Sequence, residues 1–291
     1  MSTRAHLSDP QSVSRRAFLG TGAVVAVGSL SGCLARGPFL RDEVTEAVTA
    51  TFAPADVQEI RVVNAIGDAT VRAVNTDEIG VRVLKRSVAG ARGLEDITVQ
   101  IGVEGDVLTV ETTLDDDATW FTRSSPGTDV SITVPQGTAG PIVSSISSRL
   151  GNVALFDTRG DTVARTNLGD VTAARADGYL TLESELGTIL ADDVAGLDRV
   201  RTELGQIKVD LAGLRTDVEI GTQMGDVVVG IAETLDLDVV AESNAGVDSD
   251  LPLTGVQSGG GRVSGRLNAG GSRVHVFSDV GDVSLRTIRG E

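Results

Sequence analysis

Apolar and polar residues alternate with a period of two along much of the first half of the chain. Clear examples are Val81-Arg82-Val83-Leu84 and Ile97-Thr98-Val99-Gln100-Ile101. Such alternation is typical of strands with one buried face. It predicts strands over 47–52, 59–63, 69–74, 79–84, 96–102, 107–113 and 129–134. Glu104-Gly105-Asp106 separates two of these as a hairpin turn would, so residues 46–140 are expected to form an antiparallel β region.

A sequence repeat dominates the second half. Its glycines stand at a regular nine-residue spacing, at Gly151, Gly160, Gly169, Gly178, Gly187, Gly196 and Gly205. Alternate members share a fuller motif, as in Asn167-Leu168-Gly169-Asp170-Val171, so the full repeat comprises two such intervals. Degenerate copies surround Gly225 and Gly281, and an earlier one surrounds Gly67. This periodicity predicts a coil in which each repeat lays its strands on the one before.

The repeat also predicts which side chains face the core. The apolar residues one before, two after and four after each motif glycine are expected inside: Leu168, Val171 and Ala173 in one copy, and Leu204, Ile207 and Val209 in another. The glycine provides the bend, where a positive φ or close contact with the next repeat excludes a Cβ. The predicted fold is therefore all-β, with a parallel β-solenoid of 18-residue rungs over residues 141–291. Residues 262–267 and 273–277 are expected to pair as a hairpin that caps its far end.

The N-terminal segment, 1–33, is interpreted as a targeting segment. Arg15, Arg16, Phe18 and Leu19 belong to a run that resembles the twin-arginine export signal. The uncharged stretch that follows, 17–32, is too short to span a membrane comfortably. Leu30-Ser31-Gly32-Cys33 is similar to a lipobox, in which the cysteine receives a lipid. We therefore expect a signal peptide over 1–33, a tether over 34–45, and a protein lipid-anchored at Cys33 on the outer face of the cell membrane.

Charge narrows the classes of partner. The chain has 41 acidic and 25 basic residues, only two of them Lys, and a net charge of −16. It lacks the basic face that a nucleic-acid-binding protein needs, and charge alone would not hold it on an anionic membrane. The acidic, Arg-over-Lys, Val- and Thr-rich composition resembles that of proteins from salt-loving archaea, in which carboxylates hydrate the surface. Abundant carboxylates are thus weak support for a metal or catalytic site, and no cofactor is expected.

The succession of these features carries a family resemblance. The chain begins with an anchor, followed by a strand pair around residues 64–71. Next come a strand that ends in Ile132-Thr133-Val134-Pro135 and then repeated Leu-Gly-Asp-Val units. This order resembles the β-strand-repeat "putative adhesin" family, a domain of unknown function, over about residues 46–288. The resemblance implies a right-handed parallel β-solenoid at the cell surface, with adhesion as its proposed role and no catalytic residues to carry over.

The repeat does not have the pattern of a calcium-binding site. Calcium-binding β-rolls need Gly-Gly-x-Gly-x-Asp in each nonapeptide. Here the position after the glycine is occupied in turn by Asn152, Asp161, Asp170, Tyr179, Thr188, Leu197 and Gln206. The column of ligands is broken, which favours a structural turn whose side chain bonds nearby backbone. Zinc with several Cys or His ligands is excluded, because the chain holds only Cys33, His6 and His275.

The sequence also lacks a group of residues that stands out as catalytic. A glycan-active β-helix enzyme would need paired carboxylates and an aromatic platform. Pairs such as Asp192-Asp193 occur throughout the chain, so none stands out. A nucleophilic triad would depend on His275 alone, which is expected to face outward from an alternating strand. No catalytic residue is therefore assigned.

One loop, 115–127, carries the only Trp, Trp120, next to Phe121. The pair could offer an aromatic anchor to sugar or protein, but a plug for the first end of the solenoid is favoured. The preferred function is a non-enzymatic surface lipoprotein, an adhesive or structural module of the envelope that contacts a surface glycan or an envelope protein. The alternatives are an envelope-stress sensor or regulatory partner of a membrane protein, and a glycan-active enzyme.

Overall fold

The computed structural model describes residues 24–28, 43–88, 91–115, 126–137 and 140–288. Cys33, Trp120, Phe121 and the export-signal residues lie outside these ranges. The described part is almost entirely β, with one short helix, α1 (Ala91–Glu95), and one 3-10 turn at Pro54–Asp56. None of its helices has the length and apolar character needed to cross a membrane.

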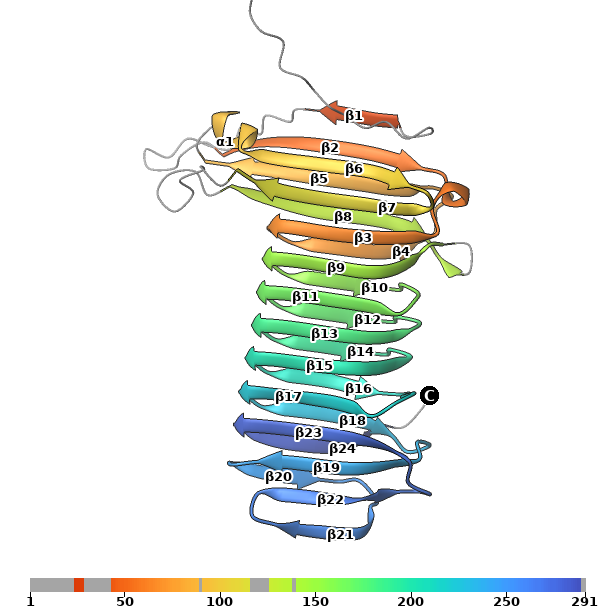
Figure 1. Cartoon of the computed structure of the whole chain (residues 1–291), viewed down its shortest axis with the longest axis vertical. Coiled ribbons are helices and arrows are strands. Elements are labelled where there is room, and N and C mark those ends of the chain that lie inside the picture. The colour runs from red at the N-terminus through yellow and green to blue at the C-terminus, as the bar shows by residue number, and fades with distance from the viewer. Residues whose placement is uncertain (1–23, 29–42, 89–90, 116–125, 138–139, 289–291) are drawn as a thin grey trace, which may run out of the picture.

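The strands form two long sheets that face each other along the molecule (Figure 1). Sheet A has the order β1 (Val24–Gly28), β2 (Val44–Phe52), β5 (Ile79–Ser87), β8 (Gly127–Pro135), β4 (Ala69–Val74), β10 (Val153–Phe156), β12 (Val171–Ala174), β14 (Ile189–Asp192), β16 (Ile207–Leu211), β18 (Val227–Ala232), β24 (Asp282–Ile288) and β20 (Gly246–Ser249). Sheet B has the order β21 (Thr254–Gly259), β22 (Arg262–Leu267), β19 (Leu237–Ser243), β23 (Ser272–Val280), β17 (Val218–Met224), β15 (Gly196–Leu204), β13 (Tyr179–Leu186), β11 (Thr162–Leu168), β9 (Ile142–Leu150), β3 (Glu59–Ile66), β7 (Val107–Leu114) and β6 (Ile97–Glu104).

The sequence repeat becomes the pairing register. In sheet B Thr162 pairs with Leu180, and in sheet A Val171 pairs with Ile189, in each case one full repeat further along the chain. The first half of a repeat thus supplies a strand of sheet B and the second half a strand of sheet A. We call such a pair of consecutive strands a rung. Parallel pairing in this register places equivalent residues of successive rungs directly beside one another.

The prediction of inward-facing residues was right for the positions after the glycine and wrong for the position before it. Val171 and Ile207 are buried, but Leu168 and Leu204 are 52% and 43% exposed. The innermost position near this corner is instead taken by a hydroxyl residue. Thr166 donates to the carbonyl of Gly151 at 2.8 Å, Ser184 to Gly169 at 3.0 Å and Thr202 to Gly187 at 3.1 Å.

These buried hydroxyls satisfy carbonyl groups that the turn would otherwise leave without partners, which is a strong requirement inside a protein. The same bond is made by Ser148, Thr222 and Ser278 in other copies of the motif, and by Ser243, which pairs with Ser278 on the next strand. Each bond joins two neighbouring rungs. A hydroxyl column therefore fixes the register along the axis of the stack.

The motif glycines stack with equal regularity. Gly151, Gly169, Gly187, Gly205, Gly225 and Gly281 have φ values between 142° and 155°. A Cβ added to Gly187 would lie 1.9 Å from the carbonyl oxygen of Gly169. The glycines of the alternate column, such as Gly178, also pack on the preceding rung, but of those predicted there only Gly160 has a positive φ. At the corner of Gly151 and its equivalents, glycine is required both by its positive φ and by close contact with the next rung. At the corner of Gly160 and Gly178, close contact is the main reason.

Residues 46–140 differ from the antiparallel region that was expected. The antiparallel pairs β2–β5, β5–β8 and β6–β7 are present, and the last includes the predicted turn at Gly105. However, β3 pairs in parallel with β7 and β9, and β4 pairs in parallel with β8 and β10. The early motif copy at Gly67 joins β3 to β4, so these strands form a rung of the stack. The sheets consequently run without interruption through the boundary expected near residue 140.

The N-terminal end of sheet A contains a strand that the sequence did not predict. β1 falls within the apolar stretch interpreted as part of the export signal, and it pairs antiparallel with β2, Val24 opposite Thr51. Its residues, Val-Val-Ala-Val-Gly, combine β-branched side chains with an available strand edge. β1 is the last strand of sheet A at this end.

The C-terminal end corrects the predicted capping hairpin. β22 pairs antiparallel with β19 and β21, and not with β23. β23 instead lies between β17 and β19 and is parallel to both, while β24 lies between β18 and β20. The reason is the motif at Gly281, which stacks on Gly225 as the other copies do. The final rung in sequence is thus an interior rung in space (Figure 1), and the end of sheet B is formed by β21 and β22.

Candidate functional site

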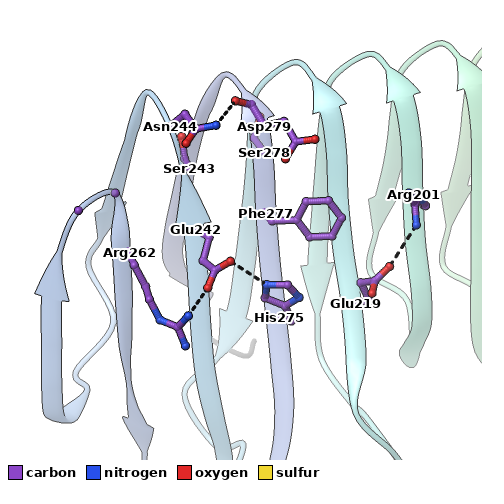
Figure 2. A pocket seen from close by; sticks show the side chains of 12 residues that line it. Arg201, Glu219, Glu242, Ser243, Asn244, Arg262, His275, Phe277, Ser278 and Asp279 are labelled. Carbon is purple, nitrogen blue, oxygen red and sulfur yellow. Dashed lines mark hydrogen bonds and ion pairs between the residues drawn. The ribbon is translucent and has the colours of Figure 1, made fainter.

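A groove of about 450 Å³ lies on the outer face of sheet B, near the end that is remote from β1. It is formed by outward-facing side chains of β15, β17, β19, β22 and β23 and by the glycines between β21 and β22. Alternation along β23 buries Val274 and Val276 and turns His275, Phe277 and Asp279 outward. His275 therefore faces outward from an alternating strand, as predicted (Figure 2).

Two aromatic rings form the floor of the groove. The rings of His275 and Phe277 stack with their centroids 5.3 Å apart and an interplanar angle of 28°. The neighbouring residue on β17 is Gly221, and a Cβ there would collide with the Phe277 ring. The absence of a side chain at Gly221 thus lets the phenyl ring lie against the sheet while remaining half exposed. This apolar surface is the natural contact for the face of a ligand.

Charged groups border the rings on both sides. Glu242 forms an ion pair with Arg262 and lies 3.6 Å from Nε2 of His275. On the other side, Oε1 of Glu219 is 3.3 Å from Arg199 and 3.6 Å from Arg201. Carboxylates and guanidinium groups therefore alternate around the aromatic floor, and Glu219 and Glu242 each have at least one cationic partner.

The end of the groove near the glycine corner is polar. Asn244 donates from Nδ2 to the carbonyl of Asp279 at 2.9 Å, as Figure 2 shows. The hydroxyls of Ser243 and Ser278 point inward and donate to Gly281 at 2.6 Å and to Gly225 at 2.7 Å. Because both serine side chains are buried and engaged with backbone, neither is available to act as a nucleophile beside His275. The arrangement suits binding.

The side chains that follow the repeat glycines, considered above as calcium ligands, form hydrogen bonds between rungs. Oδ1 of Asn152 accepts the N–H of Asp170 at 2.8 Å, and Oδ1 of Asp170 accepts the N–H of Thr188 at 2.7 Å. Asp161 does the same for Tyr179 at the alternate corner. These side chains serve as turn bonds between rungs. Across the described ranges no cluster of three or more His, Cys, Asp or Glu side chains could hold a metal ion.

A second hollow, of about 400 Å³, lies at the alternate corner and is bordered by an ion pair. Asp157 and Arg175, on adjacent rungs, have left-handed backbone with φ of 57° and 52°. The Arg175 guanidinium donates two bonds to the Asp157 carboxylate, at 2.6 and 2.9 Å. These bonds hold the pKa of Asp157 below its ordinary value of 3.8.

The Asp157–Arg175 pair predicts a pH-dependent contribution to stability. Since the pKa of Asp157 is lower in the folded state, the unfolded chain binds its proton first, and the contribution is complete above about pH 5 and declines as pH falls through the folded pKa. We expect Arg175→Gln to lower the Tm slightly, by up to about 3 °C, at pH 6. This difference should shrink as the pH falls below 3.8, toward the lowered pKa of Asp157 in the folded protein. Thermal melts of both proteins from pH 3 to 7 test it, and a difference that is constant with pH would contradict the assignment.

Comparisons with known proteins give the chain no family. No protein-family profile and no curated protein matches it. Among solved structures it is similar to a "putative cell adhesion protein" from Clostridium sporogenes, with 11% identity, a TM-score of 0.37, and coverage of 84% of this chain and all of the other. It is also similar to a "putative adhesin" from Bacteroides fragilis (13% identity, TM-score 0.35, 83% and 97% covered) and to a "putative lipid binding protein" from Parabacteroides distasonis (12%, 0.28, 83% and 94%). At these sequence identities and TM-scores, the similarities extend over most of the chain but assign neither a family nor a role.

Proposed function

We propose that the chain is a non-enzymatic adhesive module of the cell surface, held at one end by a lipid on Cys33 and binding its partner near the other. The observation that carries this proposal is the position of the groove. β2, the first strand after Cys33, lies at one end of the stack, and the groove strands β19, β22 and β23 lie toward the opposite end (Figure 1). From β2 to β24, which shares a rung with the groove strand β23, sheet A takes nine steps of about 4.8 Å, a spacer of about 43 Å. Such a spacer would hold the groove clear of the membrane.

We also infer that the two sheets are the sides of a right-handed parallel β-solenoid with 18-residue rungs. The parallel register of one full repeat per rung supports this inference, as do the stacked glycines and hydroxyls at the same corner of each rung. A solenoid whose rungs contact only their neighbours extends in one direction. This shape is suited to a rigid stalk.

The groove favours a surface glycan as its ligand. The stacked rings of His275 and Phe277 offer an apolar platform for one face of a sugar ring. Around it, Glu242, Arg262 and Asn244 bring acceptors and donors within reach of hydroxyl groups. A mostly preformed site with a flat apolar floor and a few polar groups at its edge is typical of specific small-ligand recognition.

Phe277→Ala should weaken binding of the purified, labelled protein to envelope polysaccharide and to intact cells at least about tenfold, because it removes the floor of the groove. The matched control is Phe156→Ala. Phe156 is also half buried, but it lies on the outer face of sheet A beneath Arg72. Equilibrium binding on immobilised polysaccharide measures the effect, and equal binding by wild type and Phe277→Ala would reject the groove as the contact.

The anchor is tested separately on cells. Cys33→Ala should release the protein into the medium while leaving the polysaccharide affinity of the purified protein unchanged. Cross-linking on intact cells, with captured molecules identified by mass spectrometry, then distinguishes the functions. Capture spread over surface glycan supports the adhesive module. Recurrent capture of a single membrane protein, lost in the Cys33→Ala form, would instead establish the regulatory alternative.

A further inference from the structure

A column of exposed apolar side chains runs along the glycine corner of the stack. It consists of the residue before the motif glycine in five successive rungs, and we call it the apolar ladder: Leu168, Leu186, Leu204, Met224 and Val280. These side chains are between 41% and 59% exposed, although the β pairing places each directly beside the next. They account for five of the eight large hydrophobic residues that are exposed within the described ranges.

This arrangement differs from scattered surface hydrophobics, which are normal in proteins. Contiguous apolar patches of a few hundred Å² on a monomer commonly mark interaction sites. Here the apolar character is repeated at the same position of every rung, while the residues on either side are polar. The core does not require apolar side chains at the ladder positions, because the buried position near this corner is already filled by hydroxyl residues such as Thr202 and Thr222.

Carboxylates border the apolar ladder on both sides. On the sheet B side, Glu185, Glu203 and Asp279 directly precede ladder residues. Beyond the glycines, Asp170, Asp226 and Asp282 are exposed. Asp170 and Asp226 each accept a backbone N–H through one oxygen only. The other bordering positions hold the uncharged residues Asn167, Gln223, Thr188 and Gln206. The ladder is therefore an apolar ridge between two polar rows, each of which carries a negative charge in three of the five rungs.

The charge pattern selects among possible occupants. A second copy of the chain, packed ridge to ridge, would bring rows of carboxylates against each other, and like charges at close range are unfavourable. An anionic lipid surface is disfavoured for the same reason. A partner with apolar side chains between basic ones would match both the ridge and its borders.

The spacing of the ladder selects the shape of that partner. Neighbouring rungs are about 4.8 Å apart, and one turn of an α-helix rises about 5.4 Å. A helix lying along the ridge can therefore place one apolar residue on each rung, with an accumulated mismatch of only about 2 Å over five rungs. Side chains on one face of an extended strand repeat at about 6.8 Å and would lose register after two rungs.

We propose that the apolar ladder docks an amphipathic α-helix of a partner protein, with an apolar stripe bordered by Lys and Arg. This surface differs from the glycan groove on the outer face of sheet B, and the two adjoin at Asp279. It adds a lateral protein contact along the stalk.

The test uses the full chain and a designed peptide of about 15 residues, four helical turns. Its leucines are spaced three and four positions apart, with lysines on both sides. One control peptide has the same composition with the leucines dispersed around the helix, and another has glutamate in place of lysine. Affinity is measured by fluorescence anisotropy of the labelled peptide. We expect the patterned peptide to bind at least about tenfold more tightly than either control.

The protein variants are matched by exposure. Leu186→Ser with Leu204→Ser removes the centre of the ladder and should reduce binding about tenfold or more. Val63→Ser with Val256→Ser changes two exposed residues, 44% and 53%, that lie off the ladder, and it should leave binding within about twofold. Thermal melts establish that both variants fold. If the first variant melts early, Met224→Ser and Val280→Ser, tested singly, must each weaken binding.

Three results would overturn the proposal. Equal binding of the patterned and dispersed peptides would mean that charge alone attracts them. A dimer seen by sedimentation in the wild type and lost in the ladder variant would assign the ridge to a second copy of the chain. Flotation with vesicles that contain phosphatidylglycerol, lost in the same variant, would assign it to a lipid surface.

Discussion

Gly187→Ala is expected to destabilise the protein by more than about 4 kcal/mol. The new Cβ would lie 1.9 Å from the carbonyl oxygen of Gly169. Neither backbone can move easily, because the strands that precede the two glycines are held by parallel pairing with their neighbours. The residue also has a φ of 155°, which an L-amino acid rarely adopts. Relief would require the rungs to separate, which would also strain the hydroxyl bond from Thr202 to Gly187.

The matched control for this prediction is Gly102→Ala. Gly102 lies in the edge strand β6, has no positive φ, and an added Cβ would meet nothing within 4 Å. This substitution should change the free energy of unfolding by less than about 0.5 kcal/mol. Urea denaturation monitored by circular dichroism measures both. If Gly187→Ala and Gly102→Ala unfold at similar denaturant concentrations, the stacked glycines do not determine the stability of the stack.

Val276→Asp should have a comparable effect, above about 4 kcal/mol, because it buries a charge without a partner. Val276 is fully buried in β23, between Ile220 of β17 and Ala241 of β19. Val256→Asp is the control, since Val256 is 53% exposed in the terminal strand β21, and its effect should be within about 0.5 kcal/mol. The comparison tests whether the last rung in sequence is an interior rung.

Limited proteolysis adds a spatial test of the same prediction. If β23 holds the terminal strands to the stack, Val276→Asp should make residues 237–267 sensitive to protease while the earlier rungs remain protected longer. Uniform protection in the variant would mean that β19 to β22 are attached by other contacts.

Much of the architecture follows from local sequence patterns. Alternation predicted seven strands between residues 47 and 134, and the structure has a strand at each of them. The glycine period predicted the pairing register of one repeat per rung. Both predictions succeed because the hydrophobic period of a strand and the residues of a turn depend on positions that are close together in the sequence. The hydroxyl column was also visible as Ser or Thr three positions before successive motif glycines, from Ser148 to Ser278, a signal that the hydrophobic pattern does not include.

The features missed by the sequence analysis depend on contacts between distant segments. Leu168 and Leu204 were expected inside, because hydropathy cannot distinguish a buried leucine from one on an apolar ridge. The groove combines residues from five strands, and only His275 among them had been considered. The position of β23 had one available signal: the motif at 279–283 copies that at 223–227, whereas residues 243–247 do not. The similarity between motifs indicates which strand β23 pairs with, whereas the order of the strands in the sequence does not.

The position of β23 and β24 has a consequence for the timing of folding. During synthesis β19, β20, β21 and β22 leave the ribosome before the strands that join them to β17 and β18. Until β23 and β24 emerge, β19, β21 and β22 can pair with one another, but they have no native partner in the rest of the stack. The terminal strands of the nascent chain therefore join the stack only after the later strands β23 and β24 have emerged. A chain truncated before β23 would thus carry β19 to β22 without a connection to the preceding strands of either sheet.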